Sequence, residues 1–514
     1  MSDLQLRKII LAVFAATVTT SAWAGEAELE SRITQLEETL KAMQQQRAEQ
    51  DKQLEILTKE LVGIENQMTQ KSVKASEEKK STATVQTEDG FGFKSADGKN
   101  EIKLQGRVQA DYHAFQGAGA QLANTTEVRR AYLTLAGKVY NDYDFKVTGN
   151  FADQKADTSI KTTVLDEAYF GINWWKQAKF RFGQFQMPFG LETSTSDLFN
   201  DFAERSMANA LAPFKERGGM VHGNPINGVY YGLALSTGRG KNANNTDTSN
   251  DNPEVVGRGV VNLAKFFNLN NSVVHVGGSF SHGYISPNQA FSINTASANS
   301  FLVGQGIVST STEGRGLTFF TPGSLNIAAG NELERTRLGA EAAYSYGPLK
   351  LQAEYFTHSY QGTSGTLSNG SYQFDKDINA WYVSANWLVT GEVYADSYLA
   401  ENGTWGRIKP RNSVDFSNGH YGAVVLGLRY SDYDASDFKY GSGAGAVLTG
   451  ASTGAHAVTG AVTWIMNPNT RLAVNYVDTR FENGGVATSS SNGNLSGGTA
   501  AGEKAITLRG QFDF

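Results

Sequence analysis

Residues 506–514 read ITLRGQFDF, and this stretch alternates strictly between two kinds of side chain. The apolar or small set comprises Ile506, Leu508, Gly510, Phe512 and Phe514, and the polar set comprises Thr507, Arg509, Gln511 and Asp513. Successive side chains of a β-strand point to opposite faces of the sheet, so this period of two predicts a strand with one apolar face. Residues 102–113, 130–139 and 143–151 alternate in the same way. A soluble β-sandwich would also alternate, so the pattern alone predicts only an antiparallel sheet.

The connections between such segments are more informative. About sixteen strand-like segments begin near residues 101, 126, 143, 162, 178, 216, 227, 255, 272, 333, 348, 377, 418, 454, 470 and 504. Connections after even-numbered segments are mostly tight, as at Asn141-Asp142 and Gly347-Pro348, whereas those after odd-numbered segments are long and polar, notably residues 284–332. The connection at 390–417 is an exception, because it is long where a short turn is expected. Short turns at one end and long loops at the other are the plan of an outer-membrane barrel.

The C-terminus supports this interpretation, because Phe514 lies on the apolar face of the last segment, as the final residue of such barrels commonly does. We therefore predict an all-β fold for residues 91–514, namely a transmembrane antiparallel β-barrel of about sixteen strands. The mean hydropathy of −0.36 excludes a helical membrane protein but allows a barrel whose strands alternate. With no Cys among 514 residues, disulfide frameworks, thiolate metal sites and cysteine nucleophiles are excluded. The formal net charge of −6 argues against nucleic-acid binding.

The first 24 residues have the organisation of a signal peptide. Arg7 and Lys8 precede an apolar run at residues 9–18, and Ala22-Trp23-Ala24 supplies a small-residue cleavage site. The apolar run is shorter than the ~20 residues that a membrane-spanning helix needs. A short buried helix is the alternative. We expect residues 1–24 to direct export of the chain.

Residues 25–68 have the heptad pattern of a coiled coil. Apolar residues are spaced alternately by four and three, and the same phase passes through two polar positions: Leu29, Ile33, Leu36, Leu40, Met43, Arg47, Gln50, Leu54, Leu57, Leu61, Ile64 and Met68. A period of 3.5 residues sustained this long predicts a supercoiled helix, and hence a homo-oligomer whose strand number the pattern leaves open. Arg47 and Gln50 would weaken the middle of the core and help to fix the register. The alternative is one amphipathic helix packed on a domain. Residues 69–90 are rich in Lys, Ser, Thr and Glu and predict a flexible tether.

Several stretches of the C-terminal region resemble the phosphate- and pyrophosphate-selective porin family, the porin O and P type. They are LQGRVQADY at 104–112, VRRAYL at 128–133, DEAY at 166–169, FGQF at 182–185, MPFGLE at 187–192 and AERS at 203–206, with weaker similarity at 387–392 and 422–430. The resemblance spans most of residues 91–514 and omits the long loop near 284–332. It implies a sixteen-stranded trimeric porin in the outer membrane, with a water-filled channel for passive diffusion of small anions, phosphate or pyrophosphate among them. The coiled coil would then lie in the periplasm.

A porin selects solutes by size and charge, so its candidate functional residues are the basic side chains that face the water-filled interior. By strand parity and by position in the third outer loop these are Arg107, Arg130, Lys138, Lys146, Arg181, Arg205, Lys215, Arg217, Arg337, Arg429 and Arg509. Rings of Arg and Lys suit anion pores, because guanidinium groups hold phosphate oxygens bidentately. A register slip of one residue would invert the set.

The third outer loop, about residues 188–215, is the predicted constriction, because in general porins this loop folds inward. Arg205, Lys215 and Arg217 would then meet a passing anion near the narrowest point. In the alternative interpretation, Glu204 and Arg205 form an ion pair that pins the loop to the wall.

The sequence offers no pattern typical of an enzyme. The seven His residues are scattered, without the spacing of a metal site, and the glycine-rich residues 441–445 lack the Lys-Ser/Thr of a P-loop. We therefore expect no catalysis, cofactor or metal, and we expect small anionic solutes, outer-membrane lipid and two further copies of the chain as partners. Two other functions stay open: a general or sugar-permeating porin, and a structural barrel that tethers the envelope, with the coiled coil contacting the cell wall.

Overall fold

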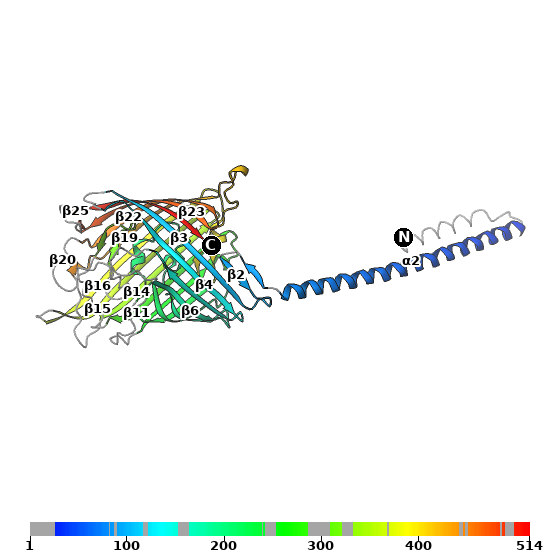
Figure 1. Cartoon of the computed structure of the whole chain (residues 1–514), viewed down its shortest axis with the longest axis horizontal. Coiled ribbons are helices and arrows are strands. Elements are labelled where there is room, and N and C mark those ends of the chain that lie inside the picture. Colours follow the sequence, from blue (N-terminus) through cyan, green and yellow to red (C-terminus); the bar gives the residue numbers. More distant parts are fainter. Residues whose placement is uncertain are drawn as a thin grey trace. The chain divides into compact units, whose positions relative to one another are not determined.

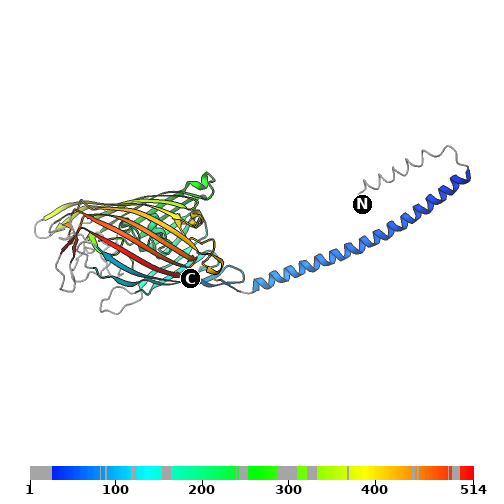
Figure 2. The same ribbon diagram turned by 90° about the horizontal axis from the view of Figure 1, so that it is seen from above.

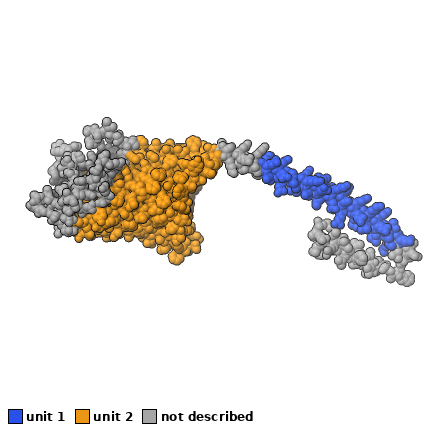
Figure 3. Space-filling model, turned by 90° about the horizontal axis from the view of Figure 1, so that it is seen from below, with its two compact units in different colours: residues 1–82 blue, residues 83–514 orange. Residues whose placement is uncertain are grey.

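The computed structural model describes residues 26–514 except 82, 87–89, 117–121, 153–163, 239, 242–252, 286–308, 321–332, 367–369, 441–445, 448–450, 484–485 and 489–497. The chain divides into two compact units, residues 1–82 and residues 83–514, which Figure 3 shows in different colours. The predicted signal peptide, residues 1–24, lies outside the described residues.

The first unit is a single long helix, α2 (Glu26–Ser81). It continues beyond residue 68 into the range predicted as a tether, where Lys, Glu and Ala residues favour a helix locally. Ile33, Leu54 and Met68, on the predicted heptad stripe, expose 53%, 68% and 69% of their surface. In the part of the chain that the structure describes, no helix has the length and apolarity needed to cross a membrane.

The second unit is a closed antiparallel β-barrel (Figures 1 and 2). Its sixteen strands are β3 (Glu101–Gln116), β4 (Thr125–Val139), β5 (Tyr143–Asn150), β6 (Val164–Ile172), β7 (Lys179–Gln186), β8 (Lys215–Gly223), β9 (Val229–Ser236), β10 (Glu254–Asn262), β11 (Ser272–Ile285), β14 (Leu333–Tyr346), β15 (Leu349–Thr366), β16 (Gly370–Leu388), β19 (Ala423–Asp434), β22 (Gly454–Asn467), β23 (Thr470–Glu482) and β26 (Gly502–Asp513). Each pairs with the next in this order, and β26 pairs with β3 to close the cylinder. The predicted fold class and number of strands are confirmed.

The seam of the barrel lies where the last strand meets the first. The backbone of Phe514 exchanges two hydrogen bonds with Gly106, at N···O distances of 2.9 and 3.1 Å. Gly106 makes this contact because a Cβ there would lie 2.3 Å from the Phe514 ring. A hairpin of β1 (Thr84–Gln86) and β2 (Phe91–Lys94) pairs with the first residues of β3. Phe91 of this hairpin packs on Phe514, with ring centroids 5.4 Å apart. The hairpin therefore extends the sheet beyond the C-terminus.

The two faces of the wall differ as the alternation predicts. On β26, Leu508 and Phe512 are 43% and 51% exposed on the outer face, whereas Arg509 and Gln511 are each only 5% exposed inside. The interior is filled by three connections that fold into the barrel. From the long-loop end come residues 187–214, here called the inner loop, and residues 309–320, the long-loop insert. Residues 389–422, the turn-side insert, come from the end with the short turns.

The remaining elements are short. The inner loop contains α3 (Leu191–Ser194) and η1 (Met207–Leu211), the long-loop insert contains β12 (Thr310–Ser311) and β13 (Thr318–Phe320), and the turn-side insert contains η3 (Tyr394–Ser397), β17 (Tyr398–Leu399), β18 (Thr404–Trp405) and η4 (Phe416–Asn418). Elsewhere lie α4 (Leu263–Phe266), β20 (Lys439–Tyr440), β21 (Ala446–Val447), β24 (Val486–Thr488) and β25 (Gly498–Ala500).

Candidate functional site

The inner loop is held inside the barrel by an apolar anchor and a tight bend. Phe185, Met187 and Phe189 are fully buried and pack with the wall residue Phe356 in one cluster. Gly190 then adopts φ 65° and ψ 153°, a backbone region that is open essentially to glycine alone. A Cβ at Gly190 would lie 2.7 Å from the Phe356 ring. The sequence MPFG therefore turns the chain from the wall into the lumen.

After this bend, the start of α3 binds the opposite wall. The backbone N–H groups of Leu191 and Glu192 donate to the Glu354 carboxylate of β15, at 2.5 and 2.9 Å. The Glu192 carboxylate in turn accepts from the backbone N–H of Ser206, at 3.0 Å, and from its hydroxyl, at 2.7 Å. These contacts fold the loop back on itself, so its shape is fixed at both of its ends.

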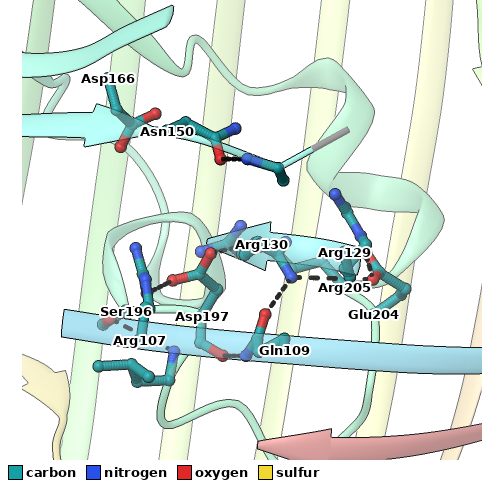
Figure 4. Close-up of polar contacts among 12 residues, drawn as sticks. Arg107, Gln109, Arg129, Arg130, Asn150, Asp166, Ser196, Asp197, Glu204 and Arg205 are labelled. Carbon is teal, nitrogen blue, oxygen red and sulfur yellow. Dashed lines mark hydrogen bonds and ion pairs between the residues drawn. The ribbon is translucent and has the colours of Figure 1, made fainter. Parts of the chain in front are cut away.

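Four carboxylates of the inner loop bind cations on the surrounding wall (Figure 4 shows two of these contacts). The ion pairs are Glu192 with Arg429 at 3.2 Å, Asp197 with Arg107 and with Arg130 at 2.5 Å, Asp201 with Lys350 at 2.5 Å, and Glu204 with Arg129 at 2.8 Å and Arg509 at 2.6 Å. These cations belong to β3, β4, β15, β19 and β26. The loop thus crosses the lumen and is fixed to the wall at several points of the circumference.

The protonation of two loop carboxylates follows from these contacts. Burial alone would raise the pKa of Asp197, but the charges of Arg107 and Arg130 outweigh it and hold this pKa well below its usual value. The same balance, with Arg129 and Arg509 as the opposing charges, holds the pKa of Glu204 well below its usual value. Both carboxylates are therefore ionised throughout the range in which an ordinary carboxyl group titrates.

One sector of the wall facing the inner loop combines cations with tyrosine rings. We call it the basic strip: Arg107 on β3, Tyr132 on β4, Lys146 on β5, Tyr169 on β6, Arg181 on β7 and Lys215 at the start of β8. The Arg107 guanidinium lies 4.1 Å from the Tyr132 ring centroid and that of Arg181 lies 4.2 Å from the Tyr169 ring. Lys215 Nζ lies 5.9 Å from the Tyr132 ring. Cations thus alternate with rings from strand to strand.

Carboxylates accompany the strip but leave part of it accessible. Lys146 pairs with Glu167, and Lys215 pairs with Asp166, which also binds Lys241 at 3.0 Å. The side chain of Lys146 remains 32% exposed despite its pair. Arg181 is half-buried, and its Nε atom is buried without a hydrogen-bond partner. The strip is consequently basic and aromatic, and it is only partly neutralised.

The turn-side insert explains the one long connection at the short-turn end. Its Trp405 is 3% exposed and donates from Nε1 to Gln352 on β15 at 2.9 Å. Lys350 Nζ lies 4.6 Å from the Trp405 ring and 4.8 Å from the Tyr394 ring. The backbone N–H of Trp405 also donates to Thr195 Oγ1 of the inner loop at 3.4 Å. The two connections therefore meet inside the lumen from opposite ends of the barrel.

The long-loop insert adds a third set of contacts. Glu313 accepts from Arg429 Nη2 at 2.6 Å and from the Thr459 hydroxyl at 2.6 Å. It also accepts from the backbone N–H of Met207 in the inner loop at 3.2 Å. The insert thus rests on the inner loop and shares the cation Arg429 with it. Together the three connections narrow the lumen to its basic strip.

A sequence model of the family described as phosphate-selective porin O and P matches residues 102–514. The chain belongs to this family. Porin O of Pseudomonas aeruginosa strain PAO1 is 26% identical over 406 residues, which cover 77% of this chain and 87% of that protein. Among solved structures, the outer-membrane channel DcaP of Acinetobacter baumannii is similar at 12% identity and a TM-score of 0.47, over 82% of this chain and 99% of that one. The trimer form of in-vitro folded OmpT of Vibrio cholerae is similar at 10% identity and a TM-score of 0.45, over 81% and 99%.

Family membership supports an outer-membrane channel rather than an enzyme, as the sequence predicted. Most of the basic residues predicted to line this porin lie inside the barrel and bind a carboxylate. They are Arg107, Arg130, Lys146, Lys215, Arg337, Arg429 and Arg509. Strand alternation located these side chains but could not foresee their partners. The lumen of this porin is therefore less basic than the list of cations suggested.

The other four candidates have different environments. Arg181 belongs to the basic strip, and Lys138 is exposed near the short turn after β4. Arg205 donates to the carbonyl groups of Glu192 and Thr195, at 3.1 and 2.9 Å, and so braces the inner loop from within. The alternative of a Glu204–Arg205 pin is replaced by Glu204 binding Arg129 and Arg509 of the wall.

The position of Arg217 differs from the prediction. Its neighbours on β8, Glu216 and Met220, are buried inside the barrel. Arg217 has the opposite parity to both and shares its face with residues paired to the exposed Leu235 of β9. Because side chains alternate along a strand, Arg217 faces away from the lumen. The prediction that it contacts the solute is therefore wrong.

Sequence reasoning missed the carboxylates that neutralise the porin's lumen, chiefly Glu192, Asp197, Asp201 and Glu313. The available indication was the density of acidic residues in loops expected to fold inward. A possible metal ligand set among the described residues is Asp111, His113 and Glu127. Its carboxylates already bind Arg509 and Arg315, so these side chains form an ion-pair network.

Proposed function

We propose that this chain is an outer-membrane porin for passive diffusion of small anions, with phosphate or pyrophosphate as the solute. The observation that carries the proposal is the basic strip opposite the inner loop, from Arg107 on β3 to Lys215 on β8. The family description, which names phosphate, and the likeness to Porin O support the same solute class. We place the protein in the outer membrane as a homotrimer, with the N-terminal helix in the periplasm.

The composition of the strip suits passage rather than tight capture. A channel must bind its ion well enough to admit it and weakly enough to release it. Lys146 and Lys215 each keep a carboxylate, so a phosphate that approaches them competes with an internal anion. Arg181 instead rests on the Tyr169 ring and supplies charge without an ion pair to exchange. An anion thus moves along cations of graded strength.

The experiment measures reversal potentials of the full-length protein in planar bilayers under a salt gradient. Removing one positive charge at about 7 Å from the path changes anion energy by about 0.6 kcal/mol in water, roughly threefold in local anion concentration. Lys146→Gln combined with Arg181→Gln should therefore move the reversal potential strongly toward the cation side. Arg217→Gln is the matched control, because this residue belongs to the same sector and faces outward.

The wild-type channel should be anion-selective, and added phosphate should reduce its chloride conductance. Wild-type cation selectivity would refute the proposal. Anion selectivity without phosphate block would indicate a general anion porin on the same fold. An equal effect of Arg217→Gln and the double variant would show that the basic strip does not line the path.

A further inference from the structure

The helix α2 carries an apolar stripe that is exposed over its whole described length. From residue 33 to residue 68 the stripe residues expose between 53% of their surface, at Ile33, and 69%, at Met68. Two further apolar residues, Ile56 and Val62, lie off the stripe. A row of large exposed apolar side chains on a soluble helix marks an interaction surface.

The spacing of the stripe defines the geometry of its partner. Steps of four and three place Ile33, Leu40, Leu54, Leu61 and Met68 at heptad position a and the intervening residues at position d. On a straight helix such a stripe would drift by about 20° per heptad. It stays on one side only when helices supercoil around each other, so the partner is another helix with the same repeat.

We infer that residues 33–68 form a parallel, in-register, three-stranded coiled coil with two further copies of this chain. Two-stranded coils favour β-branched residues at a with Leu at d, whereas Leu at a shifts the preference to higher numbers. Here Leu occupies a at residues 40, 54 and 61, and Ile33 is the one β-branched residue at a. The pairing of identical chains closes by rotation about one axis, which makes all strands parallel.

Charged and polar positions set the direction and the register. Arg32 at position g and Glu37 at position e bracket the layer of Ile33 and Leu36. In a parallel coil, g of one strand lies beside e of the next heptad on its neighbour, so this pair forms a bidentate contact between copies. Arg47 and Gln50 occupy adjacent a and d layers. Sliding the strands by one heptad would place Arg47 against leucine, so the polar layers hold the register at a cost in stability.

Disulfide cross-linking of the full-length porin tests this inference cleanly, because the chain has no cysteine. Leu36→Cys and Leu57→Cys, both at position d, should each form dimers under oxidation, and a chain with both should form covalent trimers and no larger species. Lys52→Cys, at the outer position f, is the matched control and should cross-link at least tenfold less. Channel conductance reports the barrel separately, so failure of this inference leaves the proposed function intact.

Specific outcomes would overturn the inference. An antiparallel coil would bring residue 36 opposite residue 61, so Leu36→Cys alone would fail and a mixture with Leu61→Cys would succeed. A ladder that ends at two or four chains would refute three strands, and cross-linking of Lys52→Cys equal to that of Leu36→Cys would refute the stripe as the interface. Arg47→Leu with Gln50→Leu should permit a heptad slip, which appears as cross-links between Leu36→Cys and Met43→Cys chains; their absence would refute the role of the polar layers.

Discussion

The strongest prediction concerns Glu204, which ties the inner loop to two strands at once. Its carboxylate receives Nε and Nη2 of Arg129 at 2.8 and 3.0 Å and Nη2 of Arg509 at 2.6 Å, and only 14% of its side chain is exposed. Removing one partner of a buried ion pair costs about 3–5 kcal/mol. Arg509 keeps Asp111 in Glu204→Gln, and Arg129 is 22% exposed and regains water, so we expect the lower end, about 3 kcal/mol.

This energy has a measurable consequence because it acts on the attachment of the loop. A change of about 3 kcal/mol multiplies the ratio of detached to attached states by roughly 150. Glu204→Gln should therefore add rapid current fluctuations to single-channel records in planar bilayers, while Glu204→Asp should restore part of the quiet behaviour. The control is Glu334→Gln on β14, whose side chain is 41% exposed. Records of Glu204→Gln as quiet as those of the control would refute the assignment of Glu204 as the fastening of the loop.

Three further predictions concern pH, the bend and the turn-side insert. The pKa values of Asp197 and Glu204 are depressed in the folded protein, so the stabilisation is complete above the ordinary carboxyl pKa of about 4 and disappears only as pH falls through the lower folded value; single-channel conductance should then be steady from pH 7 to about pH 4.5, and a step in a pH titration within this range would contradict it. Gly190→Ala should cost about 1–3 kcal/mol from its backbone conformation, with more from the contact with Phe356, seen as a lower unfolding temperature; an unchanged temperature would contradict the strain. Trp405→Ala should destabilise the barrel by about 3–5 kcal/mol and raise conductance, and an unchanged or lower conductance would show that the insert does not narrow the path.

The sequence predicted those features of the fold that depend on local periodicity. The alternation in residues 506–514 predicted both the final strand and the inward direction of Arg509, which follow from the geometry of a single strand. Strand ends were less well predicted, since β16 begins at Gly370 rather than near 377 and β19 begins at Ala423 rather than near 418. Pairing with a neighbouring strand extends an element beyond its own apolar pattern.

The candidate site depends on contacts that local periodicity does not encode. Leu191 binds Glu354 across 163 residues, and Arg429 binds Glu192 across 237 residues, so no window of sequence contains both partners. Parity also failed at Arg217, because it stands just after the inner loop and the loop gives no strand phase to count from. Cations could thus be assigned to a face where a strand was continuous, but their neutralisation depended on where the loops fold.

The seam between β26 and β3 has a consequence for how the protein is made. Arg509 and Asp111, which bind each other across the seam, are separated by 398 residues, and Phe514 grips Gly106 with the last residue of the chain. The cylinder therefore cannot close until synthesis is complete, and bringing its ends together is the last and entropically most demanding step. Until then both terminal strands are open edges that would pair with any other chain. Biogenesis of this barrel thus requires that a finished but unclosed chain be shielded on its way to the membrane, and the hairpin that places Phe91 against Phe514 fastens the circle once it has formed.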